Sequence, residues 1–242
     1  MARETLTRDQ IVRAALELLD ADGLEGLNMR ALGRRLDSAA TAVYWHVGAK
    51  EDLISLAGDR AWSEVDLPDP AEHGWREAAS RMAMSLYAML SRHTWLVQAF
   101  GAYPMYGPGK ARHDDHSLAV YETAGFVGAE ADRAAGTVFT FVLGNALGPA
   151  AGASFSRKLA RHGDPEEQMR ANRAESVKVA MQFPRLRTRV ETPSADYASG
   201  PDGGFEFGLH TVLDGLEGRI KRTSAGTACG AGMVAQPGND HS

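Results

Sequence analysis

The stretch that most constrains the fold is residues 27–50, LNMRALGRRLDSAATAVYWHVGAK, which has the spacing of two short helices joined by a tight turn. Met29, Leu32 and Leu36 recur at intervals of three and four residues, so the first helix has one apolar face. The rest of the chain contains no internal repeat and no alternating strand pattern. The sequence therefore predicts an all-helical protein.

A polar turn separates these two helices. The side chains of Asp37 and Ser38 compete for backbone hydrogen bonds, and Asp tolerates a left-handed backbone conformation. The second helix is expected to begin near Ala39 or Ala40 and to end by Gly48, because glycine suits a helix C-cap. A helix, a tight turn and a short helix form a helix-turn-helix unit, whose second helix can enter the major groove of DNA.

The run TAVYWHVGAKEDL, preceded by GLEGLNMRALGRRL, resembles the TetR family of bacterial transcriptional repressors over roughly residues 5–60. The residues 44–47, Tyr-Trp-His-Val, and Lys50 are similar to the tetracycline-repressor branch in particular. A weaker resemblance over residues 205–217 looks like the last dimerisation helix of that branch. One position departs from the pattern, since the turn residue that is often glycine is Asp37 here.

The resemblance implies an N-terminal three-helix domain with a helix-turn-helix, followed by a larger helical bundle that binds a ligand and dimerises. We place the first domain, with its connecting helix, at residues 1–66, because the Pro-rich run after it breaks the helix. The second domain is expected over residues 67–222, and a disordered tail over 223–242. The resemblance also implies a homodimer through helices near 129–156 and 205–222.

Apolar spacing and capping signals indicate where the helices lie. Thr7 and Gln10 fit a capping box that opens the first helix, which is expected to end at Gly23. Further helices are expected over residues 51–65, 74–92, 111–124, 129–156, 164–182 and 205–222, with a loop over 185–204. Whether that loop closes over a ligand is an open question at this stage.

Overall charge does not indicate DNA binding. The net charge is −5, and residues 1–50 hold seven basic and seven acidic side chains. Because phosphate binding depends on neutralised charge, a basic surface must come from the placement of these side chains rather than from their excess. The prediction of double-stranded DNA as a partner therefore depends on the motif.

The single cysteine, Cys229, excludes an internal disulfide and a multi-cysteine metal site. The first ten residues, MARETLTRDQ, lack the apolar run of a signal peptide, so a cytoplasmic protein is expected. Residues 134–156 carry no charge and are long enough to span a membrane. Asn145, Pro149 and many small residues weaken that alternative, so we expect a buried helix of a bundle or dimer and no membrane partner.

A recognition helix reads bases with its N-terminal residues and contacts phosphates elsewhere. This geometry puts Ala40 and Thr41 at base edges, while Tyr44, His46 and Lys50 suit the DNA backbone. The alternative for Tyr44 and His46 is local packing.

Two further residues of this region are expected in opposite environments, Arg30 at the DNA and Trp45 in the protein core. Arg30 matches a family position that reaches a base, where an arginine could bind guanine with two hydrogen bonds, and the alternative is a solvated helix face. Trp45 is expected in the core, because its neighbours take the exposed sides.

The resemblance implies a ligand pocket in the larger domain, which in the tetracycline-repressor branch holds a magnesium-bound drug. Ala99 replaces the histidine that holds this metal, so tetracycline with magnesium, or any metal or cofactor, is not expected. The residues available suit a flat, largely apolar ligand with one or two hydrogen bonds, and the alternative is that they are simply core. The candidates are Met82, Leu86, Phe100, Tyr103, His113, Ser117 and Tyr121.

No Gly-rich phosphate loop, nucleophile elbow or catalytic constellation is present, so an enzyme is not expected. The sequence and the resemblance together predict a ligand-responsive repressor, released from a palindromic operator by a lipophilic or aromatic molecule such as an antibiotic or secondary metabolite. One alternative is an effector-independent regulator or activator. Another is a helical-bundle metal protein that uses His113 and His116.

Overall fold

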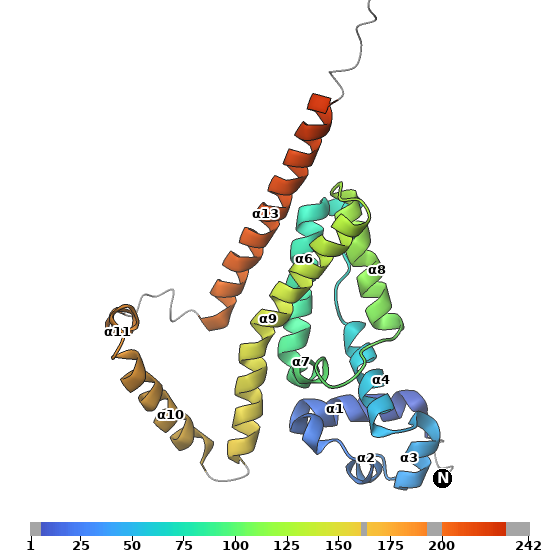
Figure 1. Ribbon diagram of the computed structural model, residues 1–242. Helices are drawn as coiled ribbons and strands as arrows, with labels where there is room; N and C mark the ends of the chain where they lie inside the picture. The colour runs from blue at the N-terminus through green and yellow to red at the C-terminus, as the bar shows by residue number, and fades with distance from the viewer. Residues whose placement is uncertain (1–5, 161–163, 193–199, 231–242) are drawn as a thin grey trace, which may run out of the picture.

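The structure, a computed structural model, describes residues 6–160, 164–192 and 200–230, and within these ranges it contains helices and no strand (Figure 1). Four helices at one end form the smaller unit. They are α1 (Arg8–Gly26), α2 (Met29–Arg35), α3 (Ala40–Val47) and α4 (Lys50–Trp62). The all-helical prediction and the helix-turn-helix are therefore confirmed.

The first helix starts where the sequence predicts. The Thr7 amide donates to Gln10 Oε1 at 2.9 Å, and the Gln10 amide donates to Thr7 Oγ1 at 3.3 Å. The helix is interrupted at its predicted end, Gly23, whose φ of 71° and ψ of −172° are not helical. After this kink the chain continues as helix to Gly26.

The larger unit is built around two long helices. It comprises α5 (Pro70–His73), α6 (Trp75–Arg92), α7 (Thr94–Ala99), α8 (Pro108–Thr123) and α9 (Ala129–Ala160). The buried residues of α9 recur every three or four positions and pack against α6 and α7. Over residues 131–150 they are Ala131, Ala134, Val138, Val142, Ala146 and Ala150, and Leu159 near the end of α9 is buried as well.

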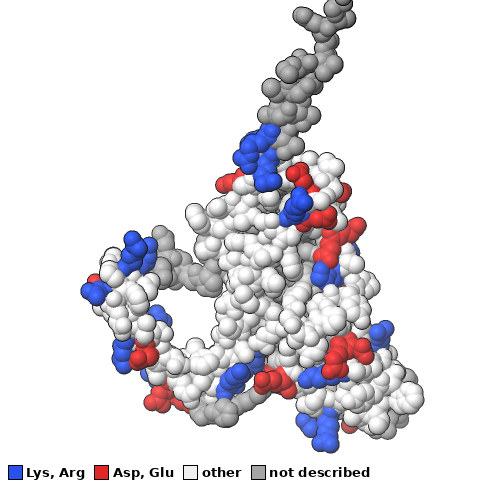
Figure 2. All heavy atoms as spheres, viewed as in Figure 1, with Lys and Arg blue, Asp and Glu red and all other residues white. Residues whose placement is uncertain are grey.

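The opposite face of α9 is open. A side chain added at Gly136, Gly144, Gly148 or Gly152 meets no other atom within 4 Å. By length and composition α9 could also cross a membrane, and only 22% of its most apolar window is buried within the chain. Figure 2 shows that the surface over the middle of the molecule, where α9 lies, carries few charged side chains. This helix therefore presents a broad uncharged face.

Three helices complete the chain: α10 (Pro165–Ala180), α11 (Pro184–Glu191) and α13 (Gly200–Gly230). In Figure 1, α10 and α11 stand away from the body, and the chain then returns to α13, which lies along α9. Phe205 anchors α13, because its ring stacks on Tyr87 at 4.1 Å and lies 5.5 Å from the ring of Phe141.

The predicted loop over residues 185–204 is wrong at both ends. Residues 185–191 belong to α11, because Pro184 occupies the first turn and starts the helix rather than only ending the one before. Residues 200–204 belong to α13, although their Gly and Pro content is typical of a loop. Residues 193–199 lie outside the described part of the chain.

The predicted disordered tail over residues 223–242 is also wrong in its first part. The backbone of α13 continues as helix to Gly230. Residues 231–242 lie outside the described residues, and so does the side chain of Cys229.

Candidate nucleic-acid interface and effector pocket

The turn between α2 and α3 sets the angle of the second helix. Asp37 adopts a left-handed conformation with φ 46°, as its side chain allows. The Ser38 amide donates to the Gly33 carbonyl at 2.9 Å. A Cβ at Gly33 would lie 2.7 Å from the Ser38 carbonyl oxygen, so only glycine lets the turn pack this closely on α2.

Two faces of α3 differ sharply in exposure. Val43 and Val47, four residues apart, are 0% and 5% exposed and fix the helix to the core. Thr41, Tyr44 and Trp45 lie on the outer side, where Tyr44 is 52% and Trp45 89% exposed. The α-helical spacing thus gives the outer face one hydroxyl and two aromatic rings.

The prediction that Trp45 lies in the core is wrong. Trp45 follows Val43 by two residues and precedes Val47 by two, so it lies about 200° around the helix from each. The two valines occupy the inner side and leave the indole outside. The spacing of the valines was the signal in the sequence that could have placed Trp45 correctly.

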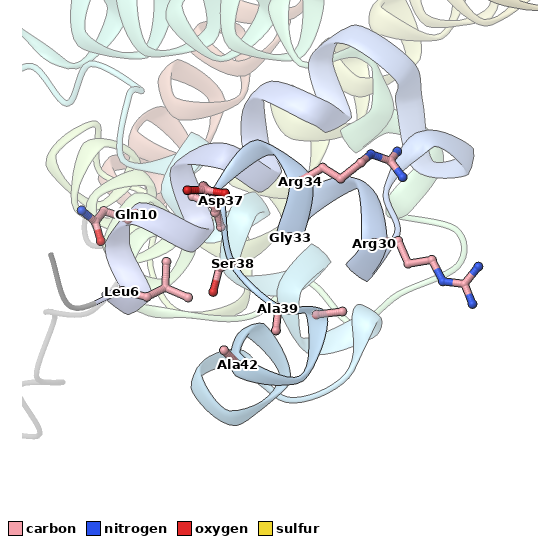
Figure 3. A pocket seen from close by; sticks show the side chains of 11 residues that line it. Leu6, Gln10, Arg30, Gly33, Arg34, Asp37, Ser38, Ala39 and Ala42 are labelled. Carbon is pink, nitrogen blue, oxygen red and sulfur yellow. The ribbon is translucent and has the colours of Figure 1, made fainter. Parts of the chain in front are cut away.

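The arginines of α2 border the same surface. Asn28 caps α2 by accepting from the Ala31 amide at 2.9 Å, and Arg30 follows in the first turn. Figure 3 shows the side chains of Arg30 and Arg34 extending from α2 on the side away from Leu6 and Gln10. Neither arginine has an ion-pair partner among the described residues.

An open groove of about 1140 Å³ runs between the start of α1, α2, the turn and α3. Its lining brings together Arg30, Ala40 and Ala42 with Gln10 of α1. Arg30 and Ala40, two of the predicted DNA-binding residues, therefore share one concave surface. Thr41, Tyr44 and His46 are exposed on the adjacent α3.

Three acidic side chains of the small unit have partners away from the groove, although Asp37 lines it. Glu17 pairs with Arg35, and Asp9 pairs with Arg60 at 3.1 Å. Asp20, which is partly exposed, bonds to His93 and Trp95 of the larger unit. Although the first fifty residues carry no net charge, these pairings leave the free arginines on α2.

Lys50 lies at a different kind of position from the other candidates. It is the first residue of α4, it is half-buried, and its Nζ donates to the Leu24 carbonyl oxygen at 2.9 Å. This contact joins the start of α4 to the end of α1. The predicted contact of Lys50 with the DNA backbone stays a prediction.

Five of the seven predicted ligand-binding residues line one small cavity of about 10 Å³ between α6, α8 and α9. They are Met82, Leu86, His113, Ser117 and Tyr121, and each is at least nine-tenths buried. Phe100 lies beside the cavity, with its ring 5.9 Å from that of Phe139. Tyr103 packs against the core but does not line this cavity. The space admits no more than one water molecule.

Polar atoms at this cavity lack partners. Within the described part of the chain, neither His113 Nε2 nor Tyr121 Oη makes a hydrogen bond. Burial raises the pKa of Tyr121, so its hydroxyl remains a neutral donor. An unsatisfied buried polar group costs about 1–3 kcal/mol, so these two atoms favour any occupant that can bond to them.

Sequence reasoning missed two aromatic residues next to the cavity. The ring of Trp62, the last residue of α4, lies 4.7 Å from that of His113 and 6.2 Å from that of Phe139. Trp62 Nε1 is also buried without a partner among the described residues. The sequence held a signal for Trp62, because it lies on the helix expected over residues 51–65, which has to contact both units.

The same helix is joined to the start of α8. Asp59 Oδ1 accepts from the amides of Gly109 at 2.8 Å and Lys110 at 3.0 Å, which caps α8. A Cβ at Gly109 would lie 2.4 Å from the Asp59 carbonyl oxygen, so the two backbones are in direct contact. Any shift of α8 therefore acts on α4.

The two histidines of α8 contact different groups. His113 lies against Trp62, whereas His116 Nε2 lies 2.9 Å from the Pro68 carbonyl oxygen. In the ranges that the structure describes, no group of three or more His, Cys, Asp or Glu side chains could hold one metal ion. The geometry gives the metal-protein alternative no support.

Two family models match the chain. Residues 11–57 match the model described as bacterial regulatory proteins, tetR family, and residues 67–220 match the tetracyclin repressor-like C-terminal domain. Together they cover both the helix-turn-helix and the bundle that holds the cavity.

The curated relatives of the chain are transcriptional regulators of the helix-turn-helix type. The chain is 33% identical to an HTH-type transcriptional regulator of Saccharopolyspora erythraea, over 84% of this chain and 82% of the relative. It is 30% identical to the HTH-type transcriptional repressor DrrR1 of Streptomyces coeruleorubidus, over 89% of this chain and 78% of the relative.

Solved structures include ActR of Streptomyces coelicolor. The ligand-free form has a TM-score of 0.69 at 26% identity and covers 92% of this chain and 100% of that one. The form in complex with actinorhodin has a TM-score of 0.67 at 25% identity and covers 88% of this chain and 96% of that one.

Proposed function

Because the chain belongs to the TetR family of bacterial regulatory proteins, it is a DNA-binding transcriptional regulator, and we propose that it is a ligand-responsive repressor acting as a homodimer on a palindromic operator. The observation that carries the proposal is the outer face of α3, where Trp45 is 89% exposed and Tyr44 52%. Such aromatic exposure on a recognition helix is best accounted for by a partner outside the chain.

Each residue of the interface has a role that its position suits. Ala40 and Thr41, at the start of α3, face base edges, and Arg30 binds a guanine from the neighbouring α2. Tyr44 and His46 contact the phosphate backbone. Lys50 acts through α1, by holding the Leu24 carbonyl and thereby the orientation of the motif.

The open face of α9, together with α13, forms the proposed dimer interface. Support comes from the glycines of α9, which leave room for a closely packed helix, and from the few charges over this face (Figure 2). A two-fold axis there makes the two α3 helices equivalent. Recognition helices about 34–36 Å apart fit successive major grooves, so the operator is a near-palindrome.

The effector binds at the cavity between α6, α8 and α9. ActR, which shares this fold, binds actinorhodin. An aromatic molecule with oxygen acceptors matches the apolar walls and the donors Tyr121 Oη and Trp62 Nε1, which have no partner among the described residues. The cavity of about 10 Å³ is far too small for such a molecule, so binding requires that α8 move away from α6 and α9.

Movement of α8 reaches the DNA through α4. The cap from Asp59 and the packing of Trp62 on His113 link these two helices. By linkage, an effector that prefers the displaced position of α8 weakens DNA binding by the same factor by which DNA weakens effector binding. The protein acts in the cytoplasm, where the operator and the effector meet.

The closed cavity favours one competing proposal, an effector-independent regulator whose aromatic residues serve as core. The two proposals differ in what small molecules do. A repressor of the proposed kind releases DNA and gains thermal stability with actinorhodin or with another lipophilic aromatic molecule. A regulator without an effector shows neither change across a panel of such molecules.

The DNA-binding role is tested by fluorescence anisotropy on duplexes selected from random sequence by the wild-type protein. Trp45→Ala and Tyr44→Ala should abolish saturable binding. Tyr106→Ala is the matched control, because this tyrosine is 70% exposed but lies in the larger unit. Equal loss in all three variants, or no selected sequence at all, would overturn the proposal.

A further inference from the structure

His93 lies at the junction of α6 and α7 and is buried, with 2% of its surface exposed. Its Nδ1 lies 2.7 Å from Asp20 Oδ1 of α1, and its Nε2 lies 3.2 Å from Glu64 Oε2, just after α4. Trp95 Nε1 donates to the same Asp20 oxygen at 2.9 Å. We call His93, Asp20, Glu64 and Trp95 the His93 junction.

The chemistry of these contacts fixes the protonation state of the ring. A carboxylate only accepts hydrogen bonds, and a neutral imidazole has a single N–H to donate. Both ring nitrogens can therefore bond to Asp20 and Glu64 only if His93 is an imidazolium. The charge then lies between two carboxylates that come from different parts of the small unit.

Other charged groups border the junction. Arg92 of α6 pairs with Glu64, and Arg157 of α9 reaches the Thr94 hydroxyl at 3.5 Å. Burial by itself lowers the pKa of His93, but the hydrogen bonds and charges of Asp20 and Glu64 outweigh it, so the pKa is raised above its ordinary value of 6.5. The two carboxylates therefore favour the charged ring despite the two nearby arginines.

The position of the junction gives it a consequence for DNA binding. Asp20 lies on α1, which packs against α3 and α4, and Glu64 follows α4 directly. His93 is joined to α6, which supplies Met82 and Leu86 to the effector cavity. Figure 1 shows α7 lying next to α1 where the two units meet. One ring thus contacts both segments that orient the helix-turn-helix.

We propose that His93, in its protonated form, is the positioning residue that holds the DNA-reading unit against the effector unit, and that loss of its proton releases this hold and weakens DNA binding. This inference rests on the proposed function, in which the orientation seen here, with its closed cavity, is the effector-free state that binds DNA. When the ring becomes neutral, one of its two nitrogens faces a carboxylate oxygen as a second acceptor. That contact then turns from attraction to repulsion.

The sign of the pH effect follows from the raised pKa. Stability contributed by His93 is fully present below the unfolded pKa of about 6.5 and is lost as the pH rises through the folded value. DNA affinity should fall in the same direction, by about three- to tenfold, since a tenfold change corresponds to one pKa unit of coupling.

The test measures DNA affinity from about pH 6 to about pH 8.5, the range in which a histidine with a raised pKa titrates. All proteins carry His46→Gln, which removes a second imidazole from the exposed face of α3 at the same cost in affinity for every variant. In that background the parent should lose affinity with rising pH, and His93→Gln should bind with a flat profile. Asp20→Asn should move the midpoint to lower pH, and His73→Gln, a surface control on α5, should behave like the parent.

A second readout does not need DNA. The thermal midpoint of the parent should fall relative to that of His93→Gln as the pH rises above about 6.5. If His93→Gln does not fold, Asp20→Asn and Glu64→Gln carry the test through the shift of the midpoint. Identical pH profiles for the parent and His93→Gln, or a midpoint unmoved by Asp20→Asn, would overturn the proposal. If the parent binds no duplex but its thermal midpoint still falls relative to that of His93→Gln as the pH rises, the proposed function is overturned and the role of His93 in joining the two units is not.

Discussion

The outer face of α3 and the cavity beneath α8 use similar side chains in opposite ways. On α3 an indole and a phenol, Trp45 and Tyr44, are exposed and have no role in holding the chain together. At the cavity an indole and a phenol, Trp62 and Tyr121, are 1% and 0% exposed and close the space that a ligand would need. The proposed DNA-binding surface is already exposed, whereas the proposed effector site has no room for a ligand in this structure.

This difference predicts where substitutions act. Changes on α3 should remove DNA binding and leave folding intact, because the side chains contact little within the chain. Changes at the cavity should alter stability first, since protein interiors are closely packed. A loss of stability from a change on α3, or an unchanged stability after a change at the cavity, would contradict this comparison.

The largest effect is expected from the two tryptophans. Trp62→Ala should lower the free energy of unfolding by about 3–5 kcal/mol, because a fully buried indole leaves a large cavity. Trp45→Ala should change it by less than about 0.5 kcal/mol, as is usual for surface positions. Urea denaturation of both variants measures the difference directly. Similar losses in the two proteins would contradict the assignment of Trp45 to the outer face.

The next effect is on DNA affinity. Arg30→Ala should weaken binding to the selected duplex by about 1–3 kcal/mol, the range for one bidentate contact to guanine, and should relax specificity at one base pair. Arg35→Ala is the control, because this neighbour is already paired with Glu17. Anisotropy titrations at fixed salt provide the numbers. If the Arg35 variant loses as much affinity, Arg30 has no special role.

A smaller effect of opposite sign is expected inside the cavity. Tyr121→Phe keeps the shape of the ring and removes a buried hydroxyl without a partner among the described residues, so it should raise stability by about 1 kcal/mol. The same change should weaken any effector that accepts a hydrogen bond there. Thermal unfolding without ligand is the check, and a clear loss of stability would mean that the hydroxyl is satisfied.

The smallest effect concerns Asp114, which lies on the outer side of α8. Burial raises the pKa of its carboxyl, but contacts with His113 and with Lys110, at 2.5 Å, outweigh this and lower the pKa below its ordinary value of 3.8. The resulting stability is present above that unfolded value and is lost as the pH falls through the folded one. Asp114→Asn should therefore reduce the steepness of acid unfolding, seen by circular dichroism, and an unchanged acid limb would count against the contact.

Sequence reasoning succeeded where local chemistry decides the structure. The capping box at Thr7 and the left-handed turn at Asp37 follow from side chains that bond to nearby backbone, and both are present. Of the five residues that line the cavity, the family resemblance indicated Met82 and Leu86, and a spacing of four residues placed His113, Ser117 and Tyr121 on one helix face; their role in ligand binding stays a prediction.

Prediction failed where several local signals compete or where distant segments meet. Trp45 was assigned to the core because its neighbours were expected to take the exposed sides, although the valines on either side determine which way it points. Pro184 and the glycines near residue 200 indicated a loop, yet both begin helices. Contacts such as His93 with Asp20 join residues 73 positions apart, and no local pattern predicts them.

The central claim is that two copies of α3 read one operator. Hydroxyl-radical footprinting of the wild-type complex on its selected duplex tests this most directly. Two symmetric protected patches about one helical turn, 10–10.5 base pairs, apart or a multiple of it are the predicted result. A single patch, or protection without two-fold symmetry, would contradict the account.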